Sequence, residues 1–209
     1  MNNAKIIIMS FFVLVVVHLA YAAVGCTLND PERDIKRLFP GSTGYKTFYI
    51  TIKEQGGEAL KKEIELELGD TLEPVYESID VPYTFYTVLK GKDVIGYVHG
   101  VNQKGKYGGM QLILSSDLDN KTIDFYFQKM SSPEAGKFMD KRFADQFKGL
   151  TLDNFMKNSA SIDDPTEKSH EDFKATLRGI KKNLILIRKL YLKDGHRFSP
   201  ETSGKADLK

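Results

Sequence analysis

Three short polar segments of this 209-residue chain contain residue types that could hold a ligand. They are the glycine-rich stretch 105–109 (GKYGG), the stretch Ser131–Gly136 (SSPEAG) and the stretch Lys168–His170 (KSH). Glycine lets the backbone approach a bound group closely, and the free N–H groups at a helix start attract anions. A helix that begins near Ser169, with the Lys168 ammonium beside it, therefore offers a site for an anionic group.

Acidic residues stand at the same predicted helix start. Glu167, Glu171 and Asp172 surround Lys168–His170 in the sequence. Negative charge at this position stabilises a helix N-terminus that holds no ligand, and it repels a phosphate. We therefore expect weak rather than tight binding of an anion here.

The other residues that could do chemistry do not form a recognisable catalytic or metal site. The four histidines lack the spacing of metal ligands, and the single cysteine, Cys26, excludes a zinc site built on cysteines. No nucleophile stands beside a base as in a hydrolase. The stretch 105–109 precedes a predicted strand rather than a helix, so it is not a dinucleotide-binding loop. We expect no catalytic residue and no metal.

Composition is that of a globular protein, with 41% hydrophobic and 28% charged residues. The length suits one main domain with end segments. The formal net charge of +2 gives no sign of the basic stripe that nucleic-acid-binding proteins carry. We therefore expect no nucleic-acid partner.

An apolar run at residues 6–25 marks the N-terminus as a membrane-targeting segment and predicts export of the rest. Three fates are open. The run ends in A-V-G-C, which resembles a lipobox and makes Cys26 a candidate lipid anchor. Alternatively the run spans the bilayer uncleaved, or cleavage after Ala20-Tyr21-Ala22 releases the protein. The first two are favoured because the run is long for a signal peptide, so we expect a membrane tether.

The elements that must position the three polar segments follow from hydrophobic periodicity and turn residues. Asp30 and Pro31 predict the start of a helix that ends at Leu38. The stretch 58–68 predicts a helical start passing into a strand. Predicted strands occupy residues 45–54, 83–90, 94–101, 110–115 and 122–129. Because the turns between the last four are short, we expect an antiparallel meander rather than a βαβ fold.

Helices are predicted after the strands. Phe138, Phe143 and Phe147 fall on roughly one helical face that ends at Gly149. Residues 151–157 predict a short helix or strand, and apolar spacing predicts a long helix over 169–192. The fold class is thus α+β, an antiparallel meander sheet flanked by helices with an N-terminal membrane-targeting helix. We divide the chain into a signal or anchor segment (1–26), one domain (27–193) and a disordered polar tail (194–209).

The order of several motifs resembles the FMN-binding domain. That domain occurs in the C subunit of sodium-pumping NADH:quinone reductase and in the G subunit of the Rnf electron-transport complex. The motifs are Tyr97, Gly105, Tyr107-Gly108-Gly109, the strand pair, Ser131–Gly136, and Phe143 and Phe147 before Gly149. The resemblance covers roughly residues 36–190. It implies an extracytoplasmic flavin domain on the cytoplasmic membrane of a bacterial envelope.

The resemblance also implies where FMN would lie. The site would be formed by residues of the three polar segments: Tyr107, Gly108, Ser131, Ser132, Pro133, Glu134, Ala135, Gly136, Lys168, Ser169 and His170. The glycine and proline positions would permit close approach to the flavin, while the polar side chains and the start of the long helix would bind its ring or phosphate.

The chain departs from the family at both signatures. The family loop reads Glu-Thr-Pro-Gly-Leu-Gly, and only Pro133 and Gly136 agree with it. The family's Ser-Gly-Ala-Thr, which follows an Asp, ends in the Thr that receives FMN covalently. Aligning Asp164 with that Asp places His170 at the acceptor position, whereas a shift of one residue places Ser169 there. The first register matches the apolar helix face better, so we expect noncovalent rather than covalent FMN.

Two functions follow from these observations. The first is an exported, membrane-tethered FMN-binding protein that transfers electrons to or from a redox partner protein. Such a protein is an electron-transfer subunit rather than a stand-alone enzyme. The alternative is a flavin-free binding or accessory module that keeps the fold and has lost the cofactor site.

Overall fold

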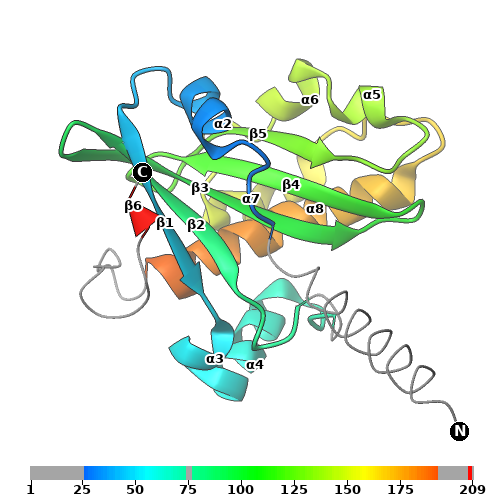
Figure 1. Cartoon of the computed structure of the whole chain (residues 1–209). Coiled ribbons are helices and arrows are strands. Elements are labelled where there is room, and N and C mark those ends of the chain that lie inside the picture. Colours follow the sequence, from blue (N-terminus) through cyan, green and yellow to red (C-terminus); the bar gives the residue numbers. More distant parts are fainter. Residues whose placement is uncertain (1–25, 74–76, 193–206, 209) are drawn as a thin grey trace, which may run out of the picture.

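The computed structural model of the chain describes residues 26–73, 77–192 and 207–208. Its centre is an antiparallel meander of five strands in the order in which they occur in the chain (Figure 1). The strands are β1 (Gly44–Ile50), β2 (Tyr83–Lys90), β3 (Asp93–Lys104), β4 (Gly109–Ser116) and β5 (Thr122–Lys129). A two-residue strand, β6 (Asp207–Leu208), pairs with the outer edge of β1. The five-stranded meander confirms the predicted α+β fold class.

Helices precede, interrupt and follow the sheet. They are α2 (Pro31–Leu38), α3 (Ile52–Gln55), α4 (Gly57–Leu68), α5 (Ala135–Phe138), α6 (Lys141–Asp145), α7 (Leu152–Asn158) and α8 (His170–Leu186). A 3₁₀ turn, η1 (Ser159–Ser161), follows α7, and a π-helical turn, η2 (Ile187–Tyr191), extends α8. The long C-terminal helix is thereby confirmed, and 151–157 is helical rather than a strand.

Helices cover both faces of the sheet, as Figure 1 shows with α8 across one face and α2 on the other. Alternate residues of β2 belong to different cores, because successive side chains of a strand point to opposite faces of the sheet. Phe85 packs in the larger core with α8 residues such as Ile180, and Tyr86 packs in the smaller core with Ile35 of α2. Burial on both faces explains why the central strands are so rich in apolar residues.

The prediction for residues 58–68 was wrong in its second half, because the whole segment is the helix α4. Leu60, Ile64 and Leu68 are buried at a spacing of four, which is the period of a helix face. Leu66, which had suggested strand alternation, is 85% exposed. Gly69, with φ +72°, ends the helix in the left-handed conformation that glycine favours.

The predicted strand 45–54 is shorter than expected, since β1 ends at Ile50. Thr51 and Glu54 form a capping box that starts α3 instead. After β5, the predicted single helix is two short helices, and the Asp140 side chain caps the second. The helical face expected from the three phenylalanines is nevertheless a packed aromatic cluster: Phe143 contacts both Phe138 and Phe147 edge to face.

The membrane-related predictions fall largely outside the described residues. The apolar run 6–25 and tail residues 194–206 and 209 lie beyond them. Within 26–73, 77–192 and 207–208, no helix has the length and apolar character needed to cross a membrane.

Candidate functional site: the start of helix α8 and the adjoining cleft

The glycine-rich stretch 105–109 is the turn between β3 and β4, and it is tied to the first helical turn of α8. Gly105 donates its N–H to the carbonyl of Gly108 (2.9 Å), and Lys106 donates its N–H to Asp172 Oδ1 (2.7 Å). A Cβ on Gly105 would lie only 2.7 Å from that same Asp172 oxygen. A side chain at 105 would therefore displace the Asp172 carboxylate from the loop.

Ser131–Gly136 lies next to this turn. Ser131 Oγ donates to the carbonyl of Gly109 (2.9 Å), and Ser132 Oγ accepts the N–H of Glu134 (3.3 Å). Pro133 and Gly136 are exposed, and Ala135 begins α5. The Tyr107 ring is also exposed, with the Lys106 ammonium 5.8 Å from its centroid.

Glu134 joins this loop to the segment before α8. Its carboxylate accepts the backbone N–H groups of Glu167 (3.1 Å) and Lys168 (2.9 Å) and pairs with Lys137 Nζ (2.9 Å). The hydrogen bond from Lys137, followed by those from the two backbone N–H groups, holds the pKa of Glu134 well below its usual range. The structure thus brings Ser131–Gly136 and Lys168–His170 together, with a carboxylate of the chain between them.

The two residues considered as flavin acceptors differ in access. Ser169 is 1% exposed, whereas the His170 side chain is 60% exposed and its Nδ1 lies 2.7 Å from Asp164 Oδ2. Asp164 Oδ1 also accepts the N–H and the hydroxyl of Thr166 (2.8 and 2.6 Å). Burial raises the pKa of Asp164, but the hydrogen bonds from Thr166 and His170 outweigh it and the pKa is lowered. Asp164 therefore holds His170 as an ion pair or hydrogen bond at the helix start.

The residues present do not fit an FMN phosphate at this position. The N–H groups of Glu167 and Lys168 already donate to Glu134. Asp172 places a second carboxylate, buried, in the first turn of α8. A dianionic phosphate would have to displace one carboxylate and lie close to another, and repulsion between like charges opposes this.

A cleft of about 1220 Å³ opens on the other side of the glycine-rich turn. It is lined by Asp70, Thr71, Glu73, Glu77, Asn102, Gln103, Lys104, Gly105, Lys106, Gly108, Gly109, Met110, Gln111, Lys129, Lys174, Ala175 and Arg178. Of the predicted cofactor-binding residues only Gly108 belongs to this lining; Ser131–Gly136 and Lys168–His170 lie outside it. The cleft contains five basic side chains against three acidic ones.

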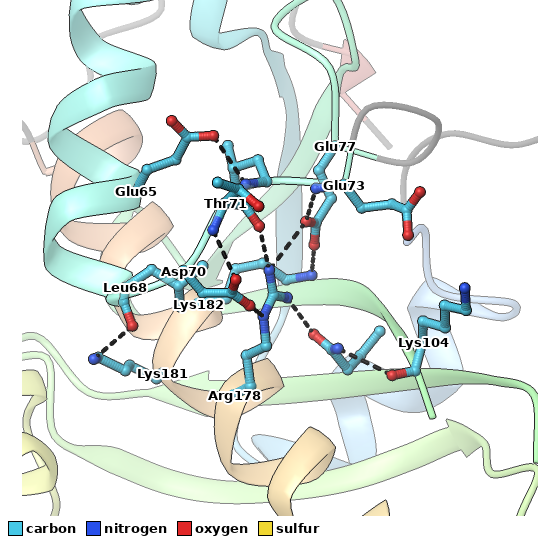
Figure 2. Close-up of polar contacts among 12 residues, drawn as sticks. Glu65, Leu68, Asp70, Thr71, Glu73, Glu77, Lys104, Arg178, Lys181 and Lys182 are labelled. Atoms are coloured by element: carbon cyan, nitrogen blue, oxygen red, sulfur yellow. Dashed lines mark hydrogen bonds and ion pairs between the residues drawn. The ribbon is translucent and has the colours of Figure 1, made fainter. Parts of the chain in front are cut away.

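Arg178 of α8 crosslinks the wall of this cleft, as Figure 2 shows. Its guanidinium donates to Asp70 Oδ2 (2.5 Å), Gln103 Oε1 (2.9 Å) and the Thr71 carbonyl (2.8 Å). The hydrogen bond from Arg178 lowers the pKa of Asp70. The connector after α4 and the end of β3 are therefore both fastened to α8.

A buried ion pair lies beneath Arg178. Lys182, 1% exposed, contacts Glu77 Oε1 and donates to the Asn102 carbonyl (2.6 Å), while Glu77 Oε2 lies 3.5 Å from Arg178 (Figure 2). Burial lowers the pKa of Lys182. The sequence did not predict this network. The sequence shows only acidic residues at 70, 73 and 77 and a group of basic residues in the long helix, and no pattern indicates that they pair.

Cys26, the candidate lipid anchor, is 2% exposed and packs in the core beneath α2. A Cβ on Gly100 of β3 would lie 2.8 Å from its sulfur, so the strand and Cys26 fit closely. A lipid on this sulfur would require the side chain to leave that packing. In the part of the chain that the structure describes, no group of three histidine, cysteine or acidic residues is placed to hold a metal ion.

The geometry at the start of α8 thus combines closely packed loops with an internal carboxylate, and the cleft beside it carries a surplus of basic side chains. A scan against models of known protein families and a search of curated proteins found no match to this chain.

Proposed function

We propose that this chain is a flavin-free binding or accessory module, built on a fold like that of the FMN-binding domain. One observation carries the proposal. The Glu134 carboxylate accepts the backbone N–H groups of Glu167 and Lys168, and so places a negative charge just before α8, where the resemblance puts the flavin phosphate. The internal contact costs no translational freedom, so it competes effectively with an external anion.

The module would act outside the cytoplasm, on the outer side of a bacterial cytoplasmic membrane. The apolar run 6–25 supports this location, either as a spanning helix or as the signal for a lipid on Cys26. Tethering would keep the folded domain beside membrane partners and raise its effective concentration there.

A second function is favoured by a different observation. Gly109 contacts Ser131, and Glu134 contacts Lys168, so the three segments that resemble flavin motifs meet in space. This convergence supports a noncovalent FMN carrier that exchanges electrons with a redox partner protein. The flavin would supply the redox chemistry, and the exposed His170 and Tyr107 are the side chains available to contact it.

The two functions are separated by flavin content. The full chain is purified from cells that contain the flavin transferase, its visible spectrum is recorded, and FMN is titrated while flavin fluorescence is followed. We expect a colourless protein and no saturable quenching. Stoichiometric FMN in the purified protein would refute the flavin-free proposal and favour the electron carrier.

The same titration on Glu134→Gly tests whether the Glu134 carboxylate is what prevents FMN binding. The loop of the FMN-binding domain has glycine at this position, and the change frees the N–H groups of Glu167 and Lys168. We expect FMN binding to become measurable in this variant. Glu171→Gln is the matched control: it removes one negative charge from the same helix start and leaves the Glu134 contacts in place, so it should gain much less.

A further inference from the structure

We infer that the cleft beside the glycine-rich turn binds an oligoanion, a ligand with several negatively charged groups. The inference rests on the proposed function, because a module without flavin needs another ligand. Three lysines from three different elements line the cleft: Lys104 at the end of β3, Lys129 at the end of β5 and Lys174 on α8. Among residues 26–73, 77–192 and 207–208, none of the three forms an ion pair, and all are exposed.

Most of the acidic charge in the cleft is already neutralised by cations of the chain. Asp70 pairs with Arg178 at 2.5 Å, and Glu77 contacts both Lys182 and Arg178. Glu73 alone has no cationic partner among the described residues. The electrostatic field that a ligand meets in the cleft is therefore set by the lysines rather than by the carboxylates.

A fourth lysine is only weakly engaged. Lys106 Nζ lies 3.5 Å from Glu171 Oε2, and both side chains are largely exposed. Exposed pairs of this kind contribute little free energy, so an anion in the cleft can compete for Lys106. Four ammonium groups around one opening suit a ligand with several anionic groups better than a single small anion.

The wall of the cleft is built in advance of binding. Arg178 is held by Asp70, Gln103 and the Thr71 carbonyl, and the buried Lys182–Glu77 pair lies below it. Figure 2 shows the Lys104 ammonium outside this dashed network, with no contact of its own among the residues drawn. A fixed wall with unpaired cations at its rim lowers the ordering cost of binding.

The size of the cleft indicates the size of the ligand. Its volume of about 1220 Å³ exceeds the range of roughly 300–1,000 Å³ that is usual for small-molecule pockets. An extended ligand with separated phosphate or carboxylate groups fits this volume and charge. Flavin is not required, since the cleft shares only Gly108 with the predicted flavin site.

The test is isothermal titration calorimetry on the full chain at low ionic strength, with tripolyphosphate as one probe and citrate as the other. The two probes distinguish phosphate from carboxylate recognition. The variant is the triple Lys104→Gln, Lys129→Gln and Lys174→Gln. The matched control is Lys62→Gln, Lys90→Gln and Lys157→Gln, which removes the same charge from exposed lysines that also lack ion pairs and do not line the cleft.

We expect saturable binding of at least one probe, weakened about tenfold or more by the cleft triple and much less by the control triple. The affinity of the wild-type chain should fall with added salt more steeply than that of the cleft triple. Absence of saturable binding for both probes overturns the inference, and so does equal weakening in the two triples. The three single cleft variants are measured alongside, so that a poorly folded triple does not decide the result.

The flavin absorbance of the same sample reports on the proposed function separately. A colourless protein that ignores both probes leaves the flavin-free module standing and removes the oligoanion cleft. A yellow protein that binds a probe in the cleft removes the flavin-free module and keeps the oligoanion site.

Discussion

Glu134 accepts the backbone N–H of Lys168 at 2.9 Å across 34 residues of sequence. The contact puts a carboxylate of the chain where the start of α8 could receive an external anion. It also connects the loop after β5 to the segment before α8. Glu134 is therefore a structural crosslink whatever ligand the protein binds.

The first prediction is that Glu134→Gln frees the amide groups that this carboxylate holds. Glutamine loses the charge and with it much of the strength of both hydrogen bonds. Amide hydrogen exchange at Glu167 and Lys168, measured by NMR, should accelerate about tenfold or more. Glu171→Gln should leave these two amides unchanged, and equal acceleration in both variants would contradict the assignment.

The pKa of Glu134 gives this contact a defined pH dependence. Because the pKa is lowered in the folded chain, the contact is fully present above the ordinary glutamate pKa of about 4.3 and is lost only as pH falls through the lower, folded value. Protection of Glu167 and Lys168, corrected for intrinsic exchange, should therefore be the same at pH 7 and pH 5.

The strands and the long helix could be predicted from the sequence because their patterns are local. β2 is a run of aromatic and β-branched residues, and α8 carries apolar side chains at three- and four-residue spacing. A strand was predicted in the second half of α4 because Ile64, Leu66 and Leu68 alternate with charged residues. In the folded chain Leu66 is exposed, so this alternation does not mark a buried strand face. The sequence of this segment does not show which of its apolar residues the rest of the protein will bury.

The site was predictable only in part. The loop at 131–136 and the segment before α8 were assigned to one site, and Glu134 does join them in the structure. The role of Glu134 could not be predicted from the sequence, because Ser-Ser-Pro-Glu is typical of an ordinary helix start. Lys182 was equally hidden: a lysine in an amphipathic helix is normally exposed, and only the connector that carries Glu77 makes its burial tolerable.

The second prediction concerns the two glycines that flank the turn at 105–109. Gly105→Ala should destabilise the chain by about 1–3 kcal/mol, since its Cβ would lie 2.7 Å from Asp172 Oδ1. Gly109→Ala is the control, because a Cβ there meets no atom within 4 Å. Urea denaturation measures both, and similar losses in the two variants would argue against the Asp172 contact.

The third prediction concerns the buried pair of Glu77 and Lys182. Glu77→Gln leaves the Lys182 ammonium buried without a counter-ion and should cost roughly 3–5 kcal/mol in the free energy of unfolding. Lys182→Met should cost less, because Arg178 still lies 3.5 Å from the Glu77 carboxylate. The double variant should lose much less free energy of unfolding than the two single variants lose together. Losses that add exactly, measured by urea denaturation, would mean that the two residues do not interact.

The fourth prediction is an acid-sensitive stability that originates at His99. Its ring is fully buried, stacks on Phe85 and lies 3.0 Å through Nδ1 from Asn183 Oδ1. Burial lowers the pKa of His99 to about 3, although the hydrogen bond with Asn183 acts in the opposite direction. Between that value and the ordinary pKa near 6.5, the unfolded chain binds a proton that the folded chain excludes.

The stability that a neutral His99 contributes is therefore present above pH 6.5 and is lost progressively as pH falls toward 3. From pH 7 to pH 5 this residue should remove about 2 kcal/mol from the free energy of unfolding. His99→Gln should flatten that part of the pH profile, and His170→Gln, a change at an exposed histidine, should retain it. An unchanged slope in His99→Gln would show that other groups cause the acid sensitivity.

The fifth prediction is that the Cys26 thiol is unreactive in the folded protein. Burial raises its pKa to about 12, so hardly any thiolate exists near neutral pH, and the sulfur packs against Gly100. A maleimide should modify Cys26 slowly in buffer and rapidly in urea, with intact mass as the measurement. Rapid labelling of the folded chain would contradict the burial. A thiol that stays blocked in urea, with a mass increase matching a lipid, would instead identify Cys26 as the anchor and require the chain to leave its packing beneath α2.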